Sequence, residues 1–422
     1  MPLTSLATRT RQHGVAALAV VAVMFLAAML VAVAASQALL TESRLAANQL
    51  RSTQAHQAAE AGLAWVLARL NDTSRIDAVC RPTSTPGASS FRARYLQIDE
   101  TTGVIAPTTW NDAGVPRPLQ TVCVRHGVGW TCSCPASGGP TWPAPTSTEA
   151  APAFRVELSA TLRPGTLRAT ATGCTLASRC EAGDGHHEAW ARVEVELALM
   201  GGLRDAPAAA LTVRVDVDPG GSGLGLHNVD PDTGVALHAG GALTVGPLRL
   251  TAPPGSPTDG GVVVADSALA SLSEERFFSR YFGMDPAAWA AQPAVTRLAC
   301  GGSCGDAVAR AIDDGASLVA VDGDLELTGP LTLGAVGQPV AIVASGAARL
   351  SGDVTLHGLL FARGIDWRSA SAPGALIRGA AVSSAGYAGD AAADIARDRM
   401  VLERLKRTRG SFARIAGSWK DF

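Results

Sequence analysis

An uncharged, strongly apolar run near the N-terminus constrains this chain more than any other feature. It extends from Val15 to Thr41, and Arg9 and Arg11 precede it without an accompanying acid. A helix rises about 1.5 Å per residue, so the run reaches roughly 40 Å, more than a hydrocarbon core of about 30 Å. The basic residues before it predict a cytoplasmic N-terminus and an exported remainder. We therefore expect a single membrane-spanning segment.

Three interpretations of this segment compete. A cleaved secretory signal has an apolar stretch of about 7–15 residues before a small-residue cleavage site. Ala32 and Ala34 could form that site, but the apolar run is too long and continues past it. An uncleaved signal anchor fits the hydropathy equally well. The third interpretation is a prepilin leader, a short basic peptide ending in glycine directly before the apolar run, and Gly14 occupies that junction.

The residues after Thr41 help to separate the interpretations. No proline or glycine interrupts the chain before Gly62, and most residues are good helix formers. Apolar side chains recur on one face at Leu39, Leu50, Ala58, Ala61, Trp65 and Leu70. The sequence predicts one helix from Val15 to about Leu70, hydrophobic in its first half and amphipathic in its second. A plain signal anchor needs no such extension.

The start of the chain resembles a known family. The run RQHGVAALAVVAV, followed by the element QAAEAG at 57–62, is similar to the N-terminus of PilX-type pilus assembly proteins, which are minor pilins. The resemblance implies cleavage between Gly14 and Val15 by prepilin peptidase, methylation of the new terminus, and packing of the helix into a filament core. It also implies other pilin subunits and the pilus assembly machinery as partners. The assembly-helix residues it marks are Ala19, Gln57, Ala58, Ala59, Glu60 and Gly62.

One position departs from the pattern of major pilins. Most of them carry glutamate at the fifth mature position, where this chain has Ala19. PilX-type proteins and the pseudopilins at the tip of secretion systems often lack that glutamate as well. The departure favours a tip or low-copy subunit over a repeating one.

The exported remainder is expected to be mainly β. The chain has 45 glycines and 24 prolines, which suits turn-rich sheet structure. Alternating segments at 154–174, 188–200 and 211–219 predict strands of an antiparallel head. With a net charge of −2 and no block of basic residues, a nucleic-acid partner is not indicated.

The C-terminal part contains a degenerate repeat. The segment GPLTL at 329–333 recurs as GDVTL at 352–356, and later echoes give a period of roughly 20 residues. Short strands with glycine between them suggest a β-solenoid-like module of about three turns or a strand-rich sandwich. A helix at 390–410 and the final residues are expected to cap it. A further helix is expected at 266–292.

The overall expectation is an α+β chain with five parts. They are a leader (1–14), a transmembrane and assembly helix (15–70), a cysteine-containing pilin-like β head (71–219), Gly/Pro-rich loops with a helical patch (220–316), and the repetitive module (317–422).

Eight cysteines in an exported chain indicate disulfides. Short loops favour the pairs Cys174–Cys180 and Cys300–Cys304; the other pairings cannot be deduced from spacing. A zinc site could be drawn from Cys123, Cys132, Cys134 and His126, but it lacks two well-spaced ligand pairs. The acids Asp216, Asp218, Asp230 and Asp232, or Asp322 and Asp324, could hold calcium, yet no EF-hand spacing accompanies them, so we interpret them as solvated turn acids.

A possible catalytic motif is GGSCG at 301–305, which matches G-x-S-x-G with Ser303 as nucleophile. The only later histidine is His357, and no series of alternating strands and helices surrounds the motif, so we expect no enzyme, cofactor or metal site. The sequence predicts a minor pilin-like subunit of the type IV pilus, inserted in the bacterial inner membrane before assembly, with a periplasmic or extracellular head. The alternatives are a tip pseudopilin of a type II secretion system and a membrane-anchored exported hydrolase.

Overall fold

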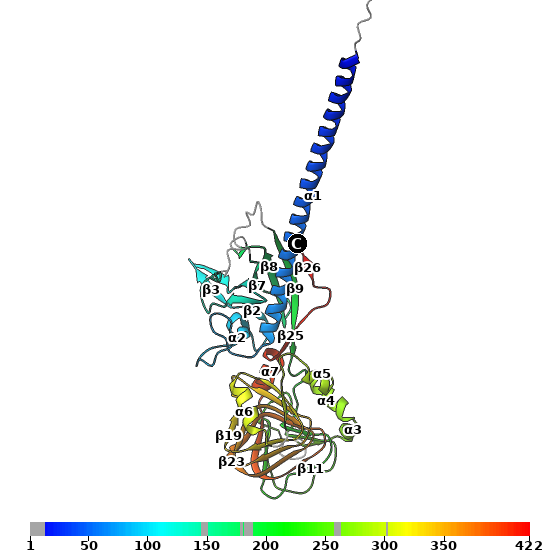
Figure 1. Cartoon of the computed structure of the whole chain (residues 1–422). Coiled ribbons are helices and arrows are strands. Elements are labelled where there is room, and N and C mark those ends of the chain that lie inside the picture. Colours follow the sequence, from blue (N-terminus) through cyan, green and yellow to red (C-terminus); the bar gives the residue numbers. More distant parts are fainter. Residues whose placement is uncertain (1–12, 145–150, 178–179, 181–188, 257–262, 301–302) are drawn as a thin grey trace, which may run out of the picture.

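A computed structural model describes residues 13–144, 151–177, 180, 189–256, 263–300 and 303–422. Figure 1 shows a long helix standing out from a β head, with a second β body beyond the head at the end remote from the free half of the helix. The predicted α+β arrangement, a long N-terminal helix followed by a mainly β region, is confirmed.

Helix α1 (His13–Asn71) is unbroken, in agreement with the helix expected from Val15 to about Leu70. From residue 16 to residue 54 every side chain is exposed, because this half projects away from the head. From Ala55 onward the helix packs against the head, and Leu63, Val66 and Leu70 are fully buried there. The amphipathic half is thus a core helix, whereas the hydrophobic half has no partner within this chain.

The head is an antiparallel sheet in the order β25-β9-β8-β7-β5-β6, with β26 also pairing with β9. Alternate residues of β7, β8 and β9 face α1, among them Phe154, Ala169 and Val195, and form one core with it. The strands are β5 (Thr121–His126), β6 (Gly129–Ser133), β7 (Ala153–Ala160), β8 (Thr166–Cys174), β9 (Trp190–Gly201), β25 (Gly410–Arg414) and β26 (Lys420–Asp421). Smaller elements join α1 to this sheet: α2 (Phe91–Tyr95), β1 (Leu96–Ile98), β2 (Ile105–Pro107), β3 (Thr109–Asp112) and β4 (Val115–Pro118).

The second body, which we call the parallel module (residues 203–408), contains strands that pair only in parallel among the described residues. Its strands form three faces. Face one consists of β16 (Thr296–Ala299), β17 (Leu318–Asp322), β20 (Val340–Ala344), the end of β22 (Val354–Ala362), the end of β23 (Ile365–Ser383), β10 (Leu211–Val213), β13 (Leu237–Ala239) and β15 (Val263–Ala265).

Face two consists of β18 (Leu325–Thr328), β21 (Ala348–Ser351), the start of β23, the start of β24 (Tyr387–Arg397) and β11 (Val217–Asp218). Face three consists of β19 (Leu331–Leu333), the start of β22, the middle of β23, the end of β24, β12 (Leu224–His227) and β14 (Leu248–Thr251). Inward side chains of all three faces, including the fully buried Trp367, make one continuous core.

The order of strands in the parallel module differs from their order in the chain. Strands β17 to β24 follow one another from residue 318 to residue 397, but the next neighbours of β23 and β24 are β10, β11 and β12 from residues 211–227. Residues 211–219, expected in the head, therefore lie in the parallel module. Much of 220–265, expected as loops, continues the same stack. Backbone pairing at long separation overrides the local alternation that suggested a head strand.

The predicted helix at 266–292 is three short helices, α3 (Ser267–Ala270), α4 (Glu274–Phe282) and α5 (Pro286–Ala290). They are separated because Ser273 and Asp285 cap new helix starts and Gly283 ends α4 in the left-handed region. The helices α4, α5 and α7 (Arg399–Thr408) cover the outer side of face one with Phe278, Trp289 and Leu402. A helix α6 (Gly305–Asp313) follows β16.

The chain enters and leaves the parallel module at one point of the head sheet. Strand β9 ends at Gly201, β25 begins at Gly410, and these two residues are antiparallel partners. Part of the helix expected at 390–410 is strand β24, and only 399–408 are helical. The final residues, expected to cap the repeat, instead return to β9 and extend the head sheet. The parallel module is thus an insertion between two neighbouring strands of the head.

Candidate assembly site

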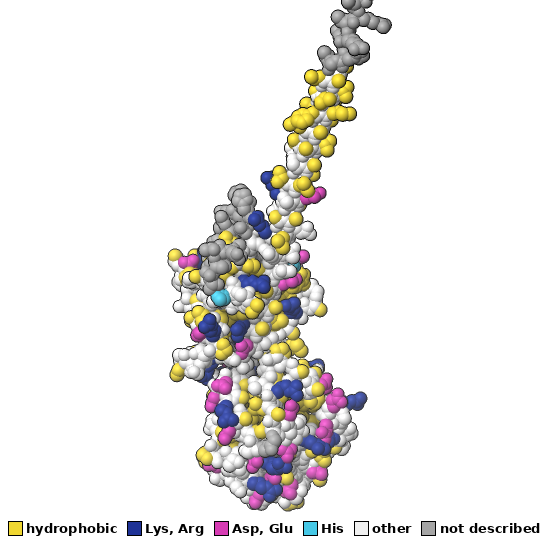
Figure 2. Space-filling model, in the orientation of Figure 1, with side chains coloured by type: hydrophobic (Ala, Val, Ile, Leu, Met, Phe, Trp, Pro, Cys, Tyr) yellow, Lys and Arg dark blue, Asp and Glu magenta, His cyan; other side chains and the backbone are white. Residues whose placement is uncertain are grey.

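The free half of α1 is an uncovered apolar surface, and Figure 2 shows hydrophobic side chains along its length. It includes Leu18, Phe25 and Leu30, each more than 60% exposed. Among the described residues α1 is the one helix long and apolar enough to cross a membrane. Residues 1–12 of the expected leader lie outside the described residues. Gly14 and Val15 fall in the first turn of the helix, and Ala19 is exposed on the free half.

The QAAEAG element lies where α1 meets the head, and its residues divide between two sides of the helix. Ala58, Ala59 and Gly62 face the sheet and are buried, while Gln57 and Glu60 are exposed. Gly62 is in close contact with β7 and β8, since a Cβ atom there would lie 3.1 Å from Phe154 and from the Cβ of Ala171. The small residues set the distance between helix and sheet. Gln57 and Glu60 lie on the outer side of the helix and are accessible to solvent.

A glycine of the sheet makes the closest approach to the helix. A Cβ atom at Gly173 of β8 would lie 2.2 Å from the Ala55 carbonyl oxygen and 2.3 Å from the Ala59 nitrogen. Any side chain there would push α1 off the sheet. Sequence reasoning missed Gly173, because a glycine in a strand carries no sign of which helix crosses it.

The end of α1 is fixed to strand β25 by the side chains of Asn71 and Arg92. The Nδ2 of Asn71 donates to the Phe412 carbonyl at 3.0 Å, and the Phe412 N–H donates to Oδ1 of Asn71 at 2.7 Å. Arg92 donates to the Leu70 carbonyl at 2.8 Å and to the Gly410 carbonyl at 2.7 Å. Burial, assisted by the charge of Arg409, lowers the pKa of Arg92 to about 10. These bonds satisfy carbonyls that a helix end leaves open and join the free helix rigidly to the head.

A groove of about 590 Å³ runs beside the packed half of α1, between the helix and the C-terminal segment. On the helix side it is lined by Gln57, Glu60, Ala61 and Ala64, and on the other side by Arg414 and Trp419. Gln57, Glu60 and Ala61 of the QAAEAG element therefore face open space. The side chain of Trp419 on the other side of the groove belongs to a residue that is 39% exposed. Small residues on a helix allow another helix to approach closely.

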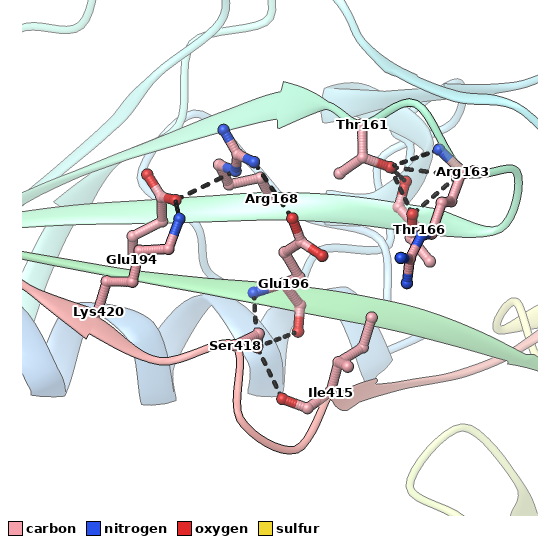
Figure 3. A network of polar contacts seen from close by, with 9 residues as sticks. All are labelled: Thr161, Arg163, Thr166, Arg168, Glu194, Glu196, Ile415, Ser418 and Lys420. Carbon is pink, nitrogen blue, oxygen red and sulfur yellow. Dashed lines mark hydrogen bonds and ion pairs between the residues drawn. The ribbon is translucent and has the colours of Figure 1, made fainter.

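The outer side of the head sheet carries a charged network rather than an apolar patch (Figure 3). Arg168 of β8 contacts Glu194 and Glu196 of β9, each at 3.2 Å, and Lys420 contacts Glu194 at 3.5 Å. The Ser418 hydroxyl accepts from the Glu196 N–H at 3.1 Å. This network holds Ser418 and Lys420, the two neighbours of the groove residue Trp419, against β9.

All eight cysteines are paired in the structure. Cys174 is bonded to Cys180 and Cys300 to Cys304, the two pairs that short loops favour. The remaining bonds are Cys80–Cys134 and Cys123–Cys132. Three of the four zinc ligands considered from the sequence are therefore oxidised to disulfides, and that site is not formed.

Of the acids considered for calcium, Asp216, Asp218 and Asp232 are exposed, whereas the side chain of Asp230 is buried in an ion pair. Asp230 is 8% exposed and pairs with Arg397, which is 5% exposed, while Asp232 pairs with Arg399 at 2.5 Å. Burial alone would raise the pKa of Asp230, but the Asp232 N–H and the two arginines outweigh it and lower that pKa. These bonds tie the loop after β12 to the end of β24.

Ser303 lies between β16 and α6, and β17 runs parallel to β16. One strand–helix–strand unit, β16–α6–β17, is therefore present here, and residues 301–302 of the motif are outside the described residues. His357 lies on β22 near Arg378, and burial together with that arginine lowers its pKa. Within the described part of the chain, no hydrogen bond joins Ser303 to a histidine.

The family match with known proteins covers only the first helix. Residues 13–64 match the family model described as PilX N-terminal. The first helix is therefore similar to a PilX-type N-terminus. The match includes Gly14, Val15, Ala19 and the QAAEAG element, so the resemblance noted in the sequence is confirmed over these residues. It ends within α1, and the head and parallel module lie beyond the PilX-type segment.

A search of solved structures aligned the competence-associated pilin ComZ from Thermus thermophilus at 10% sequence identity, with a TM-score of 0.22, over 88% of this chain and 98% of that chain. No curated protein matched significantly.

Proposed function

We propose that this chain is a minor pilin-like subunit of the type IV pilus, with an assembly rather than a catalytic role. The observation that carries the proposal is the division of α1. Its PilX-type first half is apolar and free, while its second half is the core helix of a β head. A helix of this kind can be held in the inner membrane and later withdrawn into a bundle of similar helices without any change in the head.

The proposed location follows from the same division. Before assembly, residues 15–41 span the inner membrane with the N-terminus inside, and the head and parallel module lie on the periplasmic side. Prepilin peptidase cleaves between Gly14 and Val15. The partners are then other pilin subunits, which contact the free half of α1, and the pilus assembly machinery.

The position of the parallel module favours a location of this subunit at the tip of the filament. It continues beyond the head on the side remote from the free helix (Figure 1), where the next subunit of a shaft would have to stack. In a shaft the parallel module would overlap the next subunit, whereas a subunit at the tip has no subunit above it. We further infer that the module is β-solenoid-like, because parallel partners such as Val340 and Gly358, or Leu318 and Ala341, are 18 and 23 residues apart on face one.

Mass spectrometry of the mature N-terminus tests the assignment. A methylated Val15 is expected, and a Gly14→Glu variant should retain the leader, whereas a Thr8→Ser control should be processed normally. An intact Met1 in the wild type, or a cut after Ala34, would contradict the proposal. Immunogold labelling of the parallel module should then mark filament ends; labelling along the shaft would exclude the tip placement.

A deletion strain separates the pilus from the secretion-system alternative. Loss of surface pili with normal export of secreted enzymes is the expected result. The reverse outcome would assign the chain to a secretion system as a tip pseudopilin.

A further inference from the structure

A cleft of about 630 Å³ opens on the parallel module, where helices α4 and α5 leave the end of face one uncovered. Its floor is apolar, formed by Ala320, Val343 and Phe361 from successive strands and by Ala290 of α5. Its rim carries charged and hydroxyl side chains from both the strands and the helices. This combination of apolar floor, polar rim and volume is typical of ligand sites, which range over about 300–1,000 Å³.

The cleft is elongated across the strands. Asp322, Ser345, Arg363 and Ser384 lie at the ends of four consecutive neighbours, β17, β20, β22 and β23, and all line it. Adjacent strands are about 4.8 Å apart, so the three steps extend over about 14 Å. That length accommodates about four residues of an extended peptide at about 3.3 Å each.

The charges on the rim indicate which side chains a bound peptide would carry. Arg297 pairs with Asp322 at 3.1 Å, and Arg363 pairs with Glu274 at 3.4 Å across the cleft. Glu275 and Asp285 also line the cleft, and neither has a basic partner among the described residues. They stand at the starts of α4 and α5, one on each helix. The uncompensated charge of the rim is negative.

We propose that this cleft binds an extended peptide segment of another protein, in which a lysine or arginine is flanked by apolar residues. The apolar side chains would lie on the floor near Val343 and Phe361, and the basic side chain would lie between Glu275 and Asp285. The site is independent of α1 and of the groove beside it. It gives the inserted module a recognition role of its own, whichever assembly the first helix joins.

The test uses the full chain in lipid nanodiscs and a set of fluorescent pentapeptides of the form Ala-Leu-X-Leu-Ala. Fluorescence anisotropy should show saturable binding when X is lysine or arginine, and binding at least tenfold weaker when X is glutamate. The double variant Glu275→Gln, Asp285→Asn should weaken the lysine peptide at least fivefold. Asparagine still caps α5, so the variant is expected to keep the wild-type melting temperature. A matched control, Glu326→Gln, removes an exposed carboxylate of β18 on face two and should leave binding unchanged.

A second variant keeps the test decisive. Ala287→Trp places a large side chain at the exposed rim of the cleft and should abolish binding of the lysine peptide. Equal affinity for lysine and glutamate peptides, or no saturable binding by either basic peptide, would overturn the proposal. Binding of lysine amide alone as tightly as the pentapeptide would show a site for small cations and would also overturn it.

Discussion

The side-chain amide of Asn71 makes both backbone hydrogen bonds of Phe412, at 3.0 Å and 2.7 Å, across 341 positions of the chain. In this way the last residue of α1 pairs with β25 as a neighbouring strand would. The contact is buried, and the Arg92 guanidinium lies 5.0 Å from the centre of the Phe412 ring. The free helix is thereby held to the strand that closes the insertion.

Replacing Asn71 with leucine should destabilise the head. The change leaves the N–H and carbonyl of Phe412 buried without partners, at a cost of about 2 kcal/mol or more. Thermal unfolding of the full chain in detergent, followed by tryptophan fluorescence, measures the loss. Asn111→Ala is the matched control, since Asn111 is exposed and bonds only the nearby Gly114 N–H. Equal melting temperatures for the two variants would mean that the Asn71 contact contributes little.

Gly173→Ala should separate α1 from the sheet. Its Cβ atom would overlap the backbone of Ala55 and Ala59, which cannot move aside as a flexible side chain could. We expect a loss of about 3 kcal/mol, at the upper end for overpacking. The control is Gly129→Ala in β6, where the nearest atom to the added carbon is 3.9 Å away. Protease cleavage within 55–70 in the Gly173 variant, and not in the control, would report detachment of the helix. Equal resistance in both variants would contradict this account of the contact.

The parallel module should lose stability in acid through Asp230. The folded pKa of this carboxyl lies below its ordinary value of 3.8, so it stabilises the fold above about pH 4. That contribution decreases as the pH falls through 3.8 toward the folded pKa. Urea midpoints at pH 3, 4, 5 and 7 should decline in the wild type and decline less steeply in Asp230→Asn. Asp205→Asn, which removes an exposed carboxylate 3.6 Å from Arg204, should follow the wild-type curve. An unchanged slope for Asp230→Asn would place the acid sensitivity elsewhere.

The head should fold without the parallel module. Gly201 and Gly410 are antiparallel partners, so residues 202–409 can be replaced by Asn-Gly, a sequence that favours a two-residue hairpin. We expect a cooperative melt and retention of Cys80–Cys134, Cys123–Cys132 and Cys174–Cys180 by disulfide mapping. Extending the deletion through Arg414 also removes β25 and Phe412, and this control should not fold. Aggregation of both proteins would show that the head depends on the inserted module.

Much of the candidate assembly site could be predicted because its signal is local. The apolar run, Gly14, Ala19 and the QAAEAG element lie within one helix, whose continuity follows from the absence of proline and glycine between Gly14 and Gly62. Periodicity located the buried face less well, since Leu50 of the expected apolar stripe is exposed and Ala61 is only half-buried. Gly173, Asn71 and Trp419 could not be found in this way. Each acts on a partner in another element, and neither its residue type nor its neighbours in sequence indicate that partner.

The sequence by itself determined that α1 is continuous and that its apolar first half must be buried in a membrane or against other proteins. It also indicated two of the disulfides through their short loops. Each of these depends on residues close together in the chain. The tertiary structure decided that strands β10 to β15 stack after β23 and β24, and that the chain returns to β9 at its end. A strand's alternation specifies which of its faces is buried but not which distant strand receives its hydrogen bonds. Only the folded chain could show that the parallel module is inserted between β9 and β25.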